Sequence, residues 1–119
     1  MNDQKGKGDR GEAAAAAALV RQGYTVLERQ YRCRWGEIDI IARSPEDILC
    51  FVEVKTRSGT AFAQAREFVT AAKQQKLRSA AGCYLAEKDL DCPCRFDVAE
   101  VYWAAEDRPR SIHYIINAF

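Results

Sequence analysis

Four charged side chains interrupt two otherwise apolar runs of the chain, GEIDIIA and FVEVKTR. They are Glu37 and Asp39 in the first run and Glu53 and Lys55 in the second. Ionised groups are costly to bury unless they are paired with an opposite charge or bound to a metal. Their placement therefore indicates either an internal ion-pair cluster or a site that does chemistry.

The period-two geometry of a strand sorts these side chains by face. The charged residues of each run share one face, and the isoleucines or valines between them share the other. An antiparallel hairpin can place Asp39 opposite Glu53, which also sets apolar residues opposite one another. The apolar pairs are Ile41 with Phe51, Ile40 with Val52 and Ile38 with Val54. This register sets Arg43 opposite Leu49 and gathers two carboxylates and an ammonium on one patch.

The patch has two interpretations, and both stay open at this point. In the structural one, Lys55 neutralises Glu53 or Asp39 in an internal salt bridge. In the functional one, the two carboxylates bind Mg²⁺, which takes oxygen ligands, keeps several waters and often bridges to a substrate phosphate. Such a cation polarises phosphoryl oxygens, and a neighbouring ammonium stabilises the charge of the transition state. Two carboxylates and a lysine are thus sufficient for phosphodiester hydrolysis, with no histidine required.

The elements that must position the patch follow from periodicity and turn signals. We expect helices over 9–22 and 70–87, and strands over 24–32, 37–42, 49–56, 95–103 and 111–117. The first helix is alanine-rich and ends at Gly23. The order αβββαββ predicts an α/β sandwich with one mixed five-stranded sheet and two helices, in a single domain over residues 1–119.

Composition narrows the class of protein. The chain has 119 residues, of which 48% are hydrophobic and 29% charged, as is usual for a globular domain. The alanine run near the amino end is preceded by Asp9 and Glu12, unlike a signal peptide, and no segment is apolar enough to span a membrane. We therefore expect a soluble, cytoplasmic protein.

The five cysteines are an odd number, and we expect reduced thiols. Cys92-Pro93-Cys94 could hold a soft metal, but a zinc site needs four ligands and the chain has the single histidine His113. A loop with two incidental thiols is the favoured interpretation.

Basic residues gather in one part of the chain. Between residues 55 and 79 there are six basic residues against Glu67 alone. The six are Lys55, Arg57, Arg66, Lys73, Lys76 and Arg78. This excess suits a phosphate backbone that lies along the second helix and the loop before it. Solvated helix and loop faces are the alternative explanation.

The order of these residues resembles a known superfamily. An acidic residue on the first helix (Glu12), an aspartate on a strand (Asp39) and Glu53-Val54-Lys55 on the next strand look like the PD-(D/E)XK nucleases. A closer resemblance is to the bacterial YraN-like proteins. It rests on GEIDIIA and FVEVKTR, in which Asp39 and Glu53 are fourteen residues apart, and on RGE near the amino end and RFDV near the carboxyl end. The YraN-like proteins are similar to archaeal Holliday junction resolvases and share the restriction-endonuclease-like fold.

The resemblance implies a role for each matching residue. It implies metal ligation by Asp39, Glu53 and the Val54 carbonyl, with Mg²⁺ as the cation and Mn²⁺ as an alternative. It makes Lys55 the catalytic lysine and Glu12 a water-mediated ligand or an orienter of water. For Glu12, stabilisation of the helix dipole is the other explanation.

Further residues of the pattern have less specific implied roles. Lys73 falls where the family has a basic residue on the second helix, on a stripe that faces the sheet, and could reach a phosphate or extend to water. With Arg57 and Lys76 it makes the expected nucleic-acid contact. Glu37 supports the site or has a structural hydrogen-bonding role. Arg95 and Asp97, in RFDV, are expected to pair with neighbours.

Three functional hypotheses follow. The first is a Mg²⁺-dependent endonuclease-like protein that hydrolyses phosphodiester bonds in DNA, with branched DNA in repair or recombination as one candidate substrate. The second is a non-cutting nucleic-acid-binding module with the nuclease fold. The third is an interaction protein whose charged patch is an ion-pair cluster. Symmetric cleavage of two strands would require a two-fold homodimer, so a dimer is also a candidate state.

Overall fold

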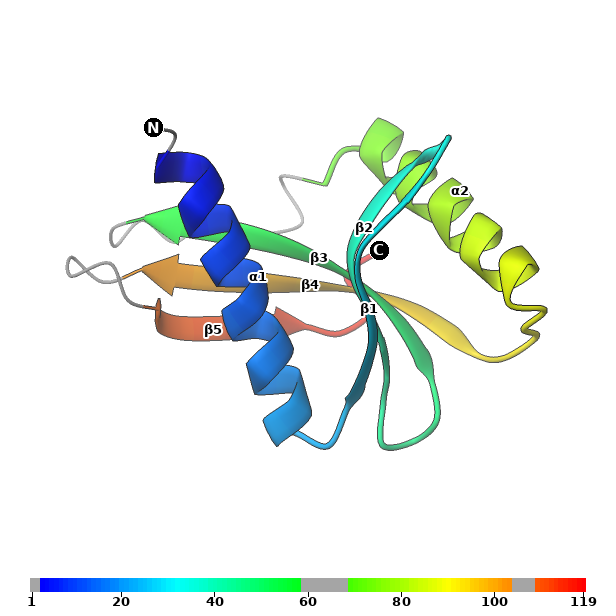
Figure 1. The fold of residues 1–119 in the computed structure, drawn as a ribbon, viewed down its shortest axis with the longest axis horizontal. Coiled ribbons are helices and arrows are strands. Elements are labelled where there is room, and N and C mark those ends of the chain that lie inside the picture. Colours follow the sequence, from blue (N-terminus) through cyan, green and yellow to red (C-terminus); the bar gives the residue numbers. More distant parts are fainter. Residues whose placement is uncertain (1–2, 59–68, 104–108) are drawn as a thin grey trace.

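The computed structural model describes residues 3–58, 69–103 and 109–119, which form two helices and a five-stranded sheet (Figure 1). The elements are α1 (Asp3–Arg21), β1 (Thr25–Cys33), β2 (Gly36–Arg43), β3 (Leu49–Ser58), α2 (Ala71–Glu87), β4 (Cys94–Trp103) and β5 (Pro109–Ile115). The strands lie in the order β1-β2-β3-β4-β5, with β3 and β4 parallel and the other neighbours antiparallel. The expected α/β fold, αβββαββ with one mixed sheet, is confirmed.

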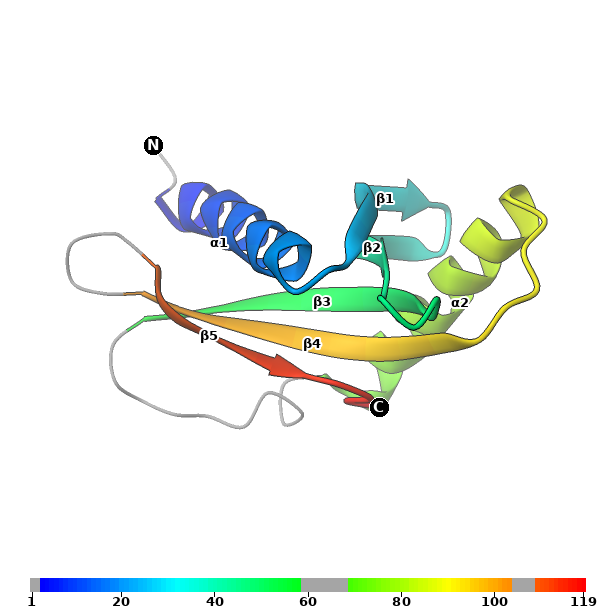
Figure 2. The ribbon, with the colours of Figure 1, turned by 90° about the horizontal axis from the view of Figure 1, so that it is seen from below.

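The two helices cover opposite faces of the sheet. Phe51 packs in a cluster with Leu77 of α2, whereas the next residue, Val52, packs in a cluster with Leu19 of α1. Successive strand residues point to opposite faces, so each helix buries one side of β3. Figure 2 shows α1 lying over β3, β4 and β5. Among the described residues, no helix combines the length and the apolar character that a membrane span requires.

The helix boundaries differ from expectation at one end. α1 begins at Asp3 rather than at residue 9, because extending an existing helix costs far less than nucleating one, and two glycines do not stop it. α2 begins at Ala71, and Thr70 is its N-cap, with its side-chain oxygen accepting a hydrogen bond from the Lys73 amide at 3.2 Å.

The register of the β2–β3 hairpin is the expected one. Arg43 pairs with Leu49, and the ladder continues to Ile40 with Val52, where it ends. Beyond that pair β2 leaves β3 and stays with β1, and Figure 1 shows the β1–β2 hairpin running across the direction of β3 and β4. The expected pairs of Asp39 with Glu53 and of Ile38 with Val54 therefore do not form in the ladder.

The face of the sheet on which Ile38 lies also differs from the expected one. We expected Ile38 and Ile40 on one face, but Ile38 packs in the cluster that contains α2 and Ile40 in the cluster that contains α1. The strict alternation fails between these two residues because β2 twists as it separates from β3. The point of separation, next to Asp39, becomes a fork in the sheet.

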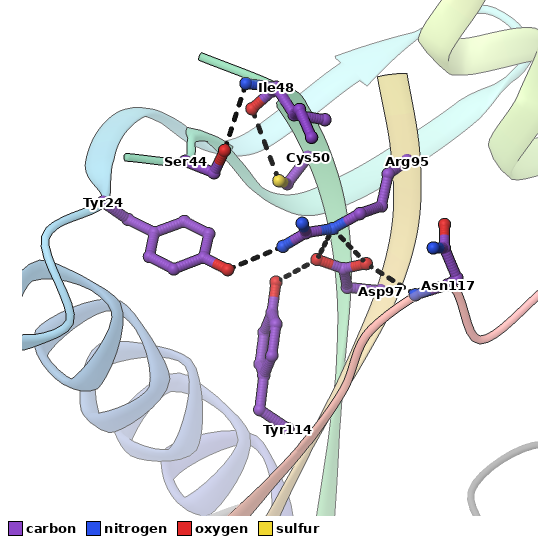
Figure 3. Close-up of polar contacts among 8 residues, drawn as sticks. All are labelled: Tyr24, Ser44, Ile48, Cys50, Arg95, Asp97, Tyr114 and Asn117. Atoms are coloured by element: carbon purple, nitrogen blue, oxygen red, sulfur yellow. Dashed lines mark hydrogen bonds and ion pairs between the residues drawn. The ribbon is translucent and has the colours of Figure 1, made fainter. Parts of the chain in front are cut away.

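A buried polar network anchors β4 to β5 and to the start of β1 (Figure 3). The fully buried Asp97 carboxylate accepts hydrogen bonds from Arg95 Nε at 3.0 Å, from the Tyr114 hydroxyl and from the Asn117 amide at 3.0 Å. Arg95 Nη2 also donates to the Tyr24 hydroxyl at 2.6 Å. Burial and the bond to Asp97 raise the pKa of Tyr114, so the hydroxyl stays a donor. The expected pairing of Arg95 and Asp97 with neighbours is confirmed.

The first prediction tests this network. Asp97→Ala leaves the buried Arg95 charge without its counter-charge, so the free energy of unfolding should fall by about 3 to 5 kcal/mol in urea titrations. Asp91→Ala, in an exposed loop, is the matched control and should change it by less than about 0.5 kcal/mol. A loss below about 1 kcal/mol for Asp97→Ala would show that the network contributes little.

Candidate functional site

The fork between β2 and β3 holds the Asp39 carboxylate. The last ladder pair of the two strands is Ile40 with Val52, so the Val54 amide on β3 has no β2 backbone opposite it in that ladder. Asp39 Oδ2 accepts its hydrogen bond instead, at 2.8 Å. A side-chain oxygen thus takes the place of a main-chain partner and holds the carboxylate at the opening of the sheet.

Ionisation of the Asp39 carboxylate is unfavourable in its surroundings. Burial, and next the negative charge of Glu53, raise its pKa from 3.8 to about 7, against the hydrogen bond from Val54, which lowers the pKa. The charges of Glu12 and Glu37 raise it further. The negative charge of Glu53 therefore acts on Asp39 and disfavours its ionisation.

Glu53 lies between two lysines. Its Oε1 is 2.8 Å from Lys73 Nζ on α2 and 3.6 Å from Lys55 Nζ on the same strand. The Glu53 side chain is only 8% exposed and that of Lys73 is 41% exposed, so the charge-assisted contact is shielded from water on the Glu53 side alone. Lys73 faces the sheet, as its helical position predicted.

The pKa values of the two lysines are shifted in opposite directions. Burial, followed by the neighbouring Lys73, lowers the pKa of Lys55. Burial acts in the same direction on Lys73, but its hydrogen bond to Glu53 and the charge of Glu53 outweigh burial and raise its pKa. Lys55 is therefore the lysine that gives up a proton more readily.

Glu12 reaches the fork from α1. It is 5% exposed, with Oε1 at 2.9 Å from Arg29 Nε and Oε2 at 3.4 Å from Gln30 Nε2. Close packing brings it there, since a Cβ at Gly11 would lie 2.7 Å from Thr56 Oγ1. Because α1 begins at Asp3, Glu12 is beyond the first turn, and the dipole explanation for Glu12 does not hold.

An open cavity of about 420 Å³ borders the fork. Glu12, Asp39 and Val54 line it, together with Gln30, Arg32 and Glu37 among others. Glu53 and Lys55 occupy the other face of β3, the face of Phe51 that α2 covers. The predicted patch is thus divided by the fork: Asp39 faces the cavity, and Glu53 lies behind it with Lys55.

The donor set suits a hard cation better than a transition metal. Across residues 3–58, 69–103 and 109–119, no three His, Cys, Asp or Glu side chains converge on a metal position. Asp39 and Glu53 are oxygen donors of the kind that Mg²⁺ takes, and Mg²⁺ would fill its remaining positions with water or substrate oxygens. Zinc would require a closed set of four ligands or three with an open position.

The remaining expected residues lie at the margins of the site. Glu37 Oε2 is 3.0 Å from Arg32 Nε in an exposed pair, which matches its structural alternative. Arg57 is largely buried, with Nε 3.7 Å from Glu100 Oε2, and Lys76 is exposed on α2. Arg66 and the loop expected to border the substrate lie outside the described residues.

Two partners of Glu12 were missed by sequence reasoning. Arg29 and Gln30 lie on β1, the strand that pairs with β2. They follow Glu12 by 17 and 18 residues in the chain. Gln30 has a φ of 52°, a left-handed conformation that asparagine adopts more readily than glutamine. No local pattern links residues 12 and 29, since only the packing of α1 against the hairpin brings them together.

Comparisons with known proteins give a family match along most of the chain. The model of the family described as "Uncharacterised protein family UPF0102" matches residues 11–101. A UPF0102 protein from Nitrosomonas europaea is 44% identical over 119 residues, covering 100% of this chain and 98% of the relative. One from Moorella thermoacetica is 45% identical over 114 residues, covering 95% and 94%.

The second prediction concerns the pH dependence of stability without divalent ions. Asp39 keeps its proton to a higher pH when folded, so between pH 3.8 and about 7 the folded chain binds more protons than the unfolded chain. The contribution of Asp39 to the free energy of unfolding is full below that window and is lost as the pH rises through it. Asp39→Asn should therefore be more stable than wild type at pH 8, by up to about 4 kcal/mol, and nearly equal at pH 3.5.

Urea titrations from pH 3.5 to pH 8 measure this difference. Asp91→Asn, in an exposed loop, is the control and should follow the wild-type curve. An Asp39→Asn curve parallel to wild type over the whole range would contradict the raised pKa.

Proposed function

Since the chain belongs to the uncharacterised protein family UPF0102, we propose its function from its own geometry: Mg²⁺-dependent hydrolysis of phosphodiester bonds in DNA, as an endonuclease-like protein. The observation that carries the proposal is the fork, where Asp39 faces an open cavity and the charge of Glu53, which is held by two lysines, raises the Asp39 pKa. An internal ion-pair cluster has no need of a repelling carboxylate at a cavity.

Membership of the PD-(D/E)XK superfamily is part of this proposal. It is supported by the motif order Glu12, Asp39, Glu53, Lys55 on the elements α1, β2 and β3, and by the αβββαββ arrangement. It is also supported by the fork, because the strand that leaves its neighbour presents Asp39 to the cavity.

Asp39 and Glu53 would hold the cation, with the Val54 carbonyl as a further oxygen on the same strand. When bound there, Mg²⁺ or Mn²⁺ would polarise the scissile phosphate and lower the pKa of water. Asp39 is fixed for this task by the Val54 amide on Oδ2. Glu12, held by Arg29 and Gln30 at the same cavity, is placed to orient an attacking water.

Lys55 supplies the adjacent positive charge. Its ammonium contacts Glu53 and stabilises negative charge that develops on a phosphate oxygen. Burial and the neighbouring Lys73 lower its pKa, which makes it the readier proton donor of the two lysines. Lys73 is the closer cation to Glu53, with its Nζ 2.8 Å from Glu53 Oε1.

DNA contact is proposed for the exposed Lys76 on α2, whose backbone lies near Gly36 at the start of β2. Arg57 and Lys73 are engaged by Glu100 and Glu53 and would contact phosphate only by leaving these partners. Branched DNA remains one candidate substrate, and a two-fold homodimer would be needed to cut it symmetrically.

A non-cutting DNA-binding module is the second candidate, and one observation favours it. Lys73 Nζ already neutralises Glu53 at 2.8 Å, so a cation must compete with a lysine for that carboxylate. In a module that has lost its metal, this ion pair would be the permanent state.

The third prediction separates the two candidates by cleavage. Linear, flapped and four-way DNA are incubated with Mg²⁺ or Mn²⁺ and with wild type, Asp39→Asn or Lys55→Ala. We expect wild type to cut, and each variant to lose about 100-fold or more in rate. Calorimetry should show weaker metal binding for Asp39→Asn and unchanged or tighter binding for Lys55→Ala, which removes a repelling charge.

Asp91→Asn is the control and should cut like wild type. Binding without cutting in either metal would favour the non-cutting module. Cutting by Asp39→Asn at the wild-type rate would place any activity elsewhere.

The fourth prediction tests the competition at Glu53. Lys73→Met removes the ammonium that holds Glu53 but keeps an apolar stem of similar length. If Glu53 is a ligand, the variant should bind Mg²⁺ about 10-fold more tightly in calorimetry, because charge competition is gone. Lys76→Met, one turn along α2 and exposed, should bind like wild type. Equal Mg²⁺ affinity of the Lys73 variant and wild type would remove Glu53 from the ligand set.

A further inference from the structure

The turn between β1 and β2 carries an exposed aromatic ring. Trp35 is 53% exposed, and the Arg34 guanidinium carbon lies 4.8 Å from the centroid of its ring. The other tryptophan, Trp103, is buried at 4% exposure. A large exposed ring on a tight turn is more suggestive of a contact surface than scattered aliphatic residues are.

The turn is held in place rather than projecting freely. Cys33 pairs with Gly36 across it, and the Trp35 amide donates to Cys33 Sγ at 3.4 Å. On its other side it lies against α2, since a Cβ at Gly36 would be 3.5 Å from the Lys76 carbonyl oxygen. Figure 1 shows the turn beside α2. Trp35 is therefore presented on a supported platform, which lowers the entropy lost when it binds.

The surroundings of Trp35 are basic and lead to the candidate site. Arg32, with a 72% exposed side chain, Arg34 and Lys76 lie around the turn, and the acid beside them, Glu37, is paired with Arg32. Arg32 also lines the cavity that contains Asp39. Three residues of β2 separate Trp35 from Asp39, and the four steps make a path of roughly 13 Å along the strand.

We propose that Trp35 is a stacking platform for an unpaired DNA base, so that this turn selects single-stranded or splayed DNA and guides it toward the cavity. The inference rests on the proposed function and names the class of DNA that the site accepts. Arg32, Arg34 and Lys76 contact the flanking phosphates, which complements their charge.

Stacking on Trp35 discriminates between forms of DNA for an energetic reason. Every base has a flat face, so stacking on an aromatic ring is tolerant of sequence. In an intact duplex both faces of a base are already covered, and a base must first be unstacked before it can lie on Trp35. Single strands, flaps and open junctions carry bases that incur little of this cost.

Fluorescence tests the contact directly, in EDTA so that no DNA is cut. Single-stranded thymidine 20-mers should quench the Trp35 emission and shield it from acrylamide. Trp35→Phe reports the signal of Trp103 alone and should show neither change. An unchanged Trp35 signal while the protein binds the 20-mer would overturn the stacking contact.

Affinity measurements test the selection. With the 20-mer and a splayed duplex, Trp35→Ala should bind about 10-fold more weakly than wild type, while Trp35→Phe should retain most of the affinity. With blunt duplex, Trp35→Ala should stay within about 2-fold of wild type. Val20→Ala, an equally exposed apolar residue on α1, is the matched control and should bind all three DNAs like wild type.

The outcomes distinguish this inference from the proposed function. Wild type that binds none of these DNAs overturns both. Wild type that binds and cuts DNA, with Trp35→Ala unchanged on every form, overturns the stacking platform and leaves the endonuclease proposal in place. An equal loss on single strands and blunt duplex would also overturn it, because Trp35 would then contact DNA without selecting unpaired bases.

Discussion

The hydrogen bond from the Val54 amide to the Asp39 carboxylate is the contact on which the arrangement of the site depends. β2 and β3 pair only as far as Ile40 and Val52, and beyond that pair the strands separate. A buried main-chain amide without a partner is costly, so the separation requires a replacement acceptor at this position. Asp39 provides it, and the same carboxylate thereby faces the cavity. The separation of β2 from β3 and the exposure of Asp39 to the cavity therefore have the same structural cause.

Two clusters of buried charge in this chain show how environment separates a structural role from a chemical one. Asp97 is fully buried, and Arg95, Tyr114 and the Asn117 amide satisfy it. A carboxylate saturated in this way has a positioning role, and it fixes β5 against β4. Asp39 is held by one amide and repelled by Glu53 at the edge of a cavity. Such a carboxylate gains from a cation or a proton, which is the condition of a site open to a ligand.

Two lysines, Lys55 and Lys73, lie close enough to Glu53 to neutralise its charge. Lys73 comes from α2, so the helix that covers one face of the sheet also controls the charge of a residue on β3. Lys55 comes from the same strand as Glu53, and it has the lower pKa of the two lysines. The position of α2 and the electrostatics of the fork are therefore coupled. Any movement of α2 would change the balance between a cation and an ammonium at Glu53.

The sequence by itself determined the order of the elements, the register of β2 and β3 and the pairing of Asp97 with its neighbours. Period-two and helical spacing are local, and register follows from loop length and apolar matching, as the pairs Ile40–Val52 and Arg43–Leu49 demonstrate. Tertiary structure alone decided that Ile38 turns to the α2 side and that Arg29 reaches Glu12. It also divided the charged patch between two faces of β3. These features depend on strand twist and on contacts between residues far apart in the chain, and neither leaves a pattern in neighbouring residues.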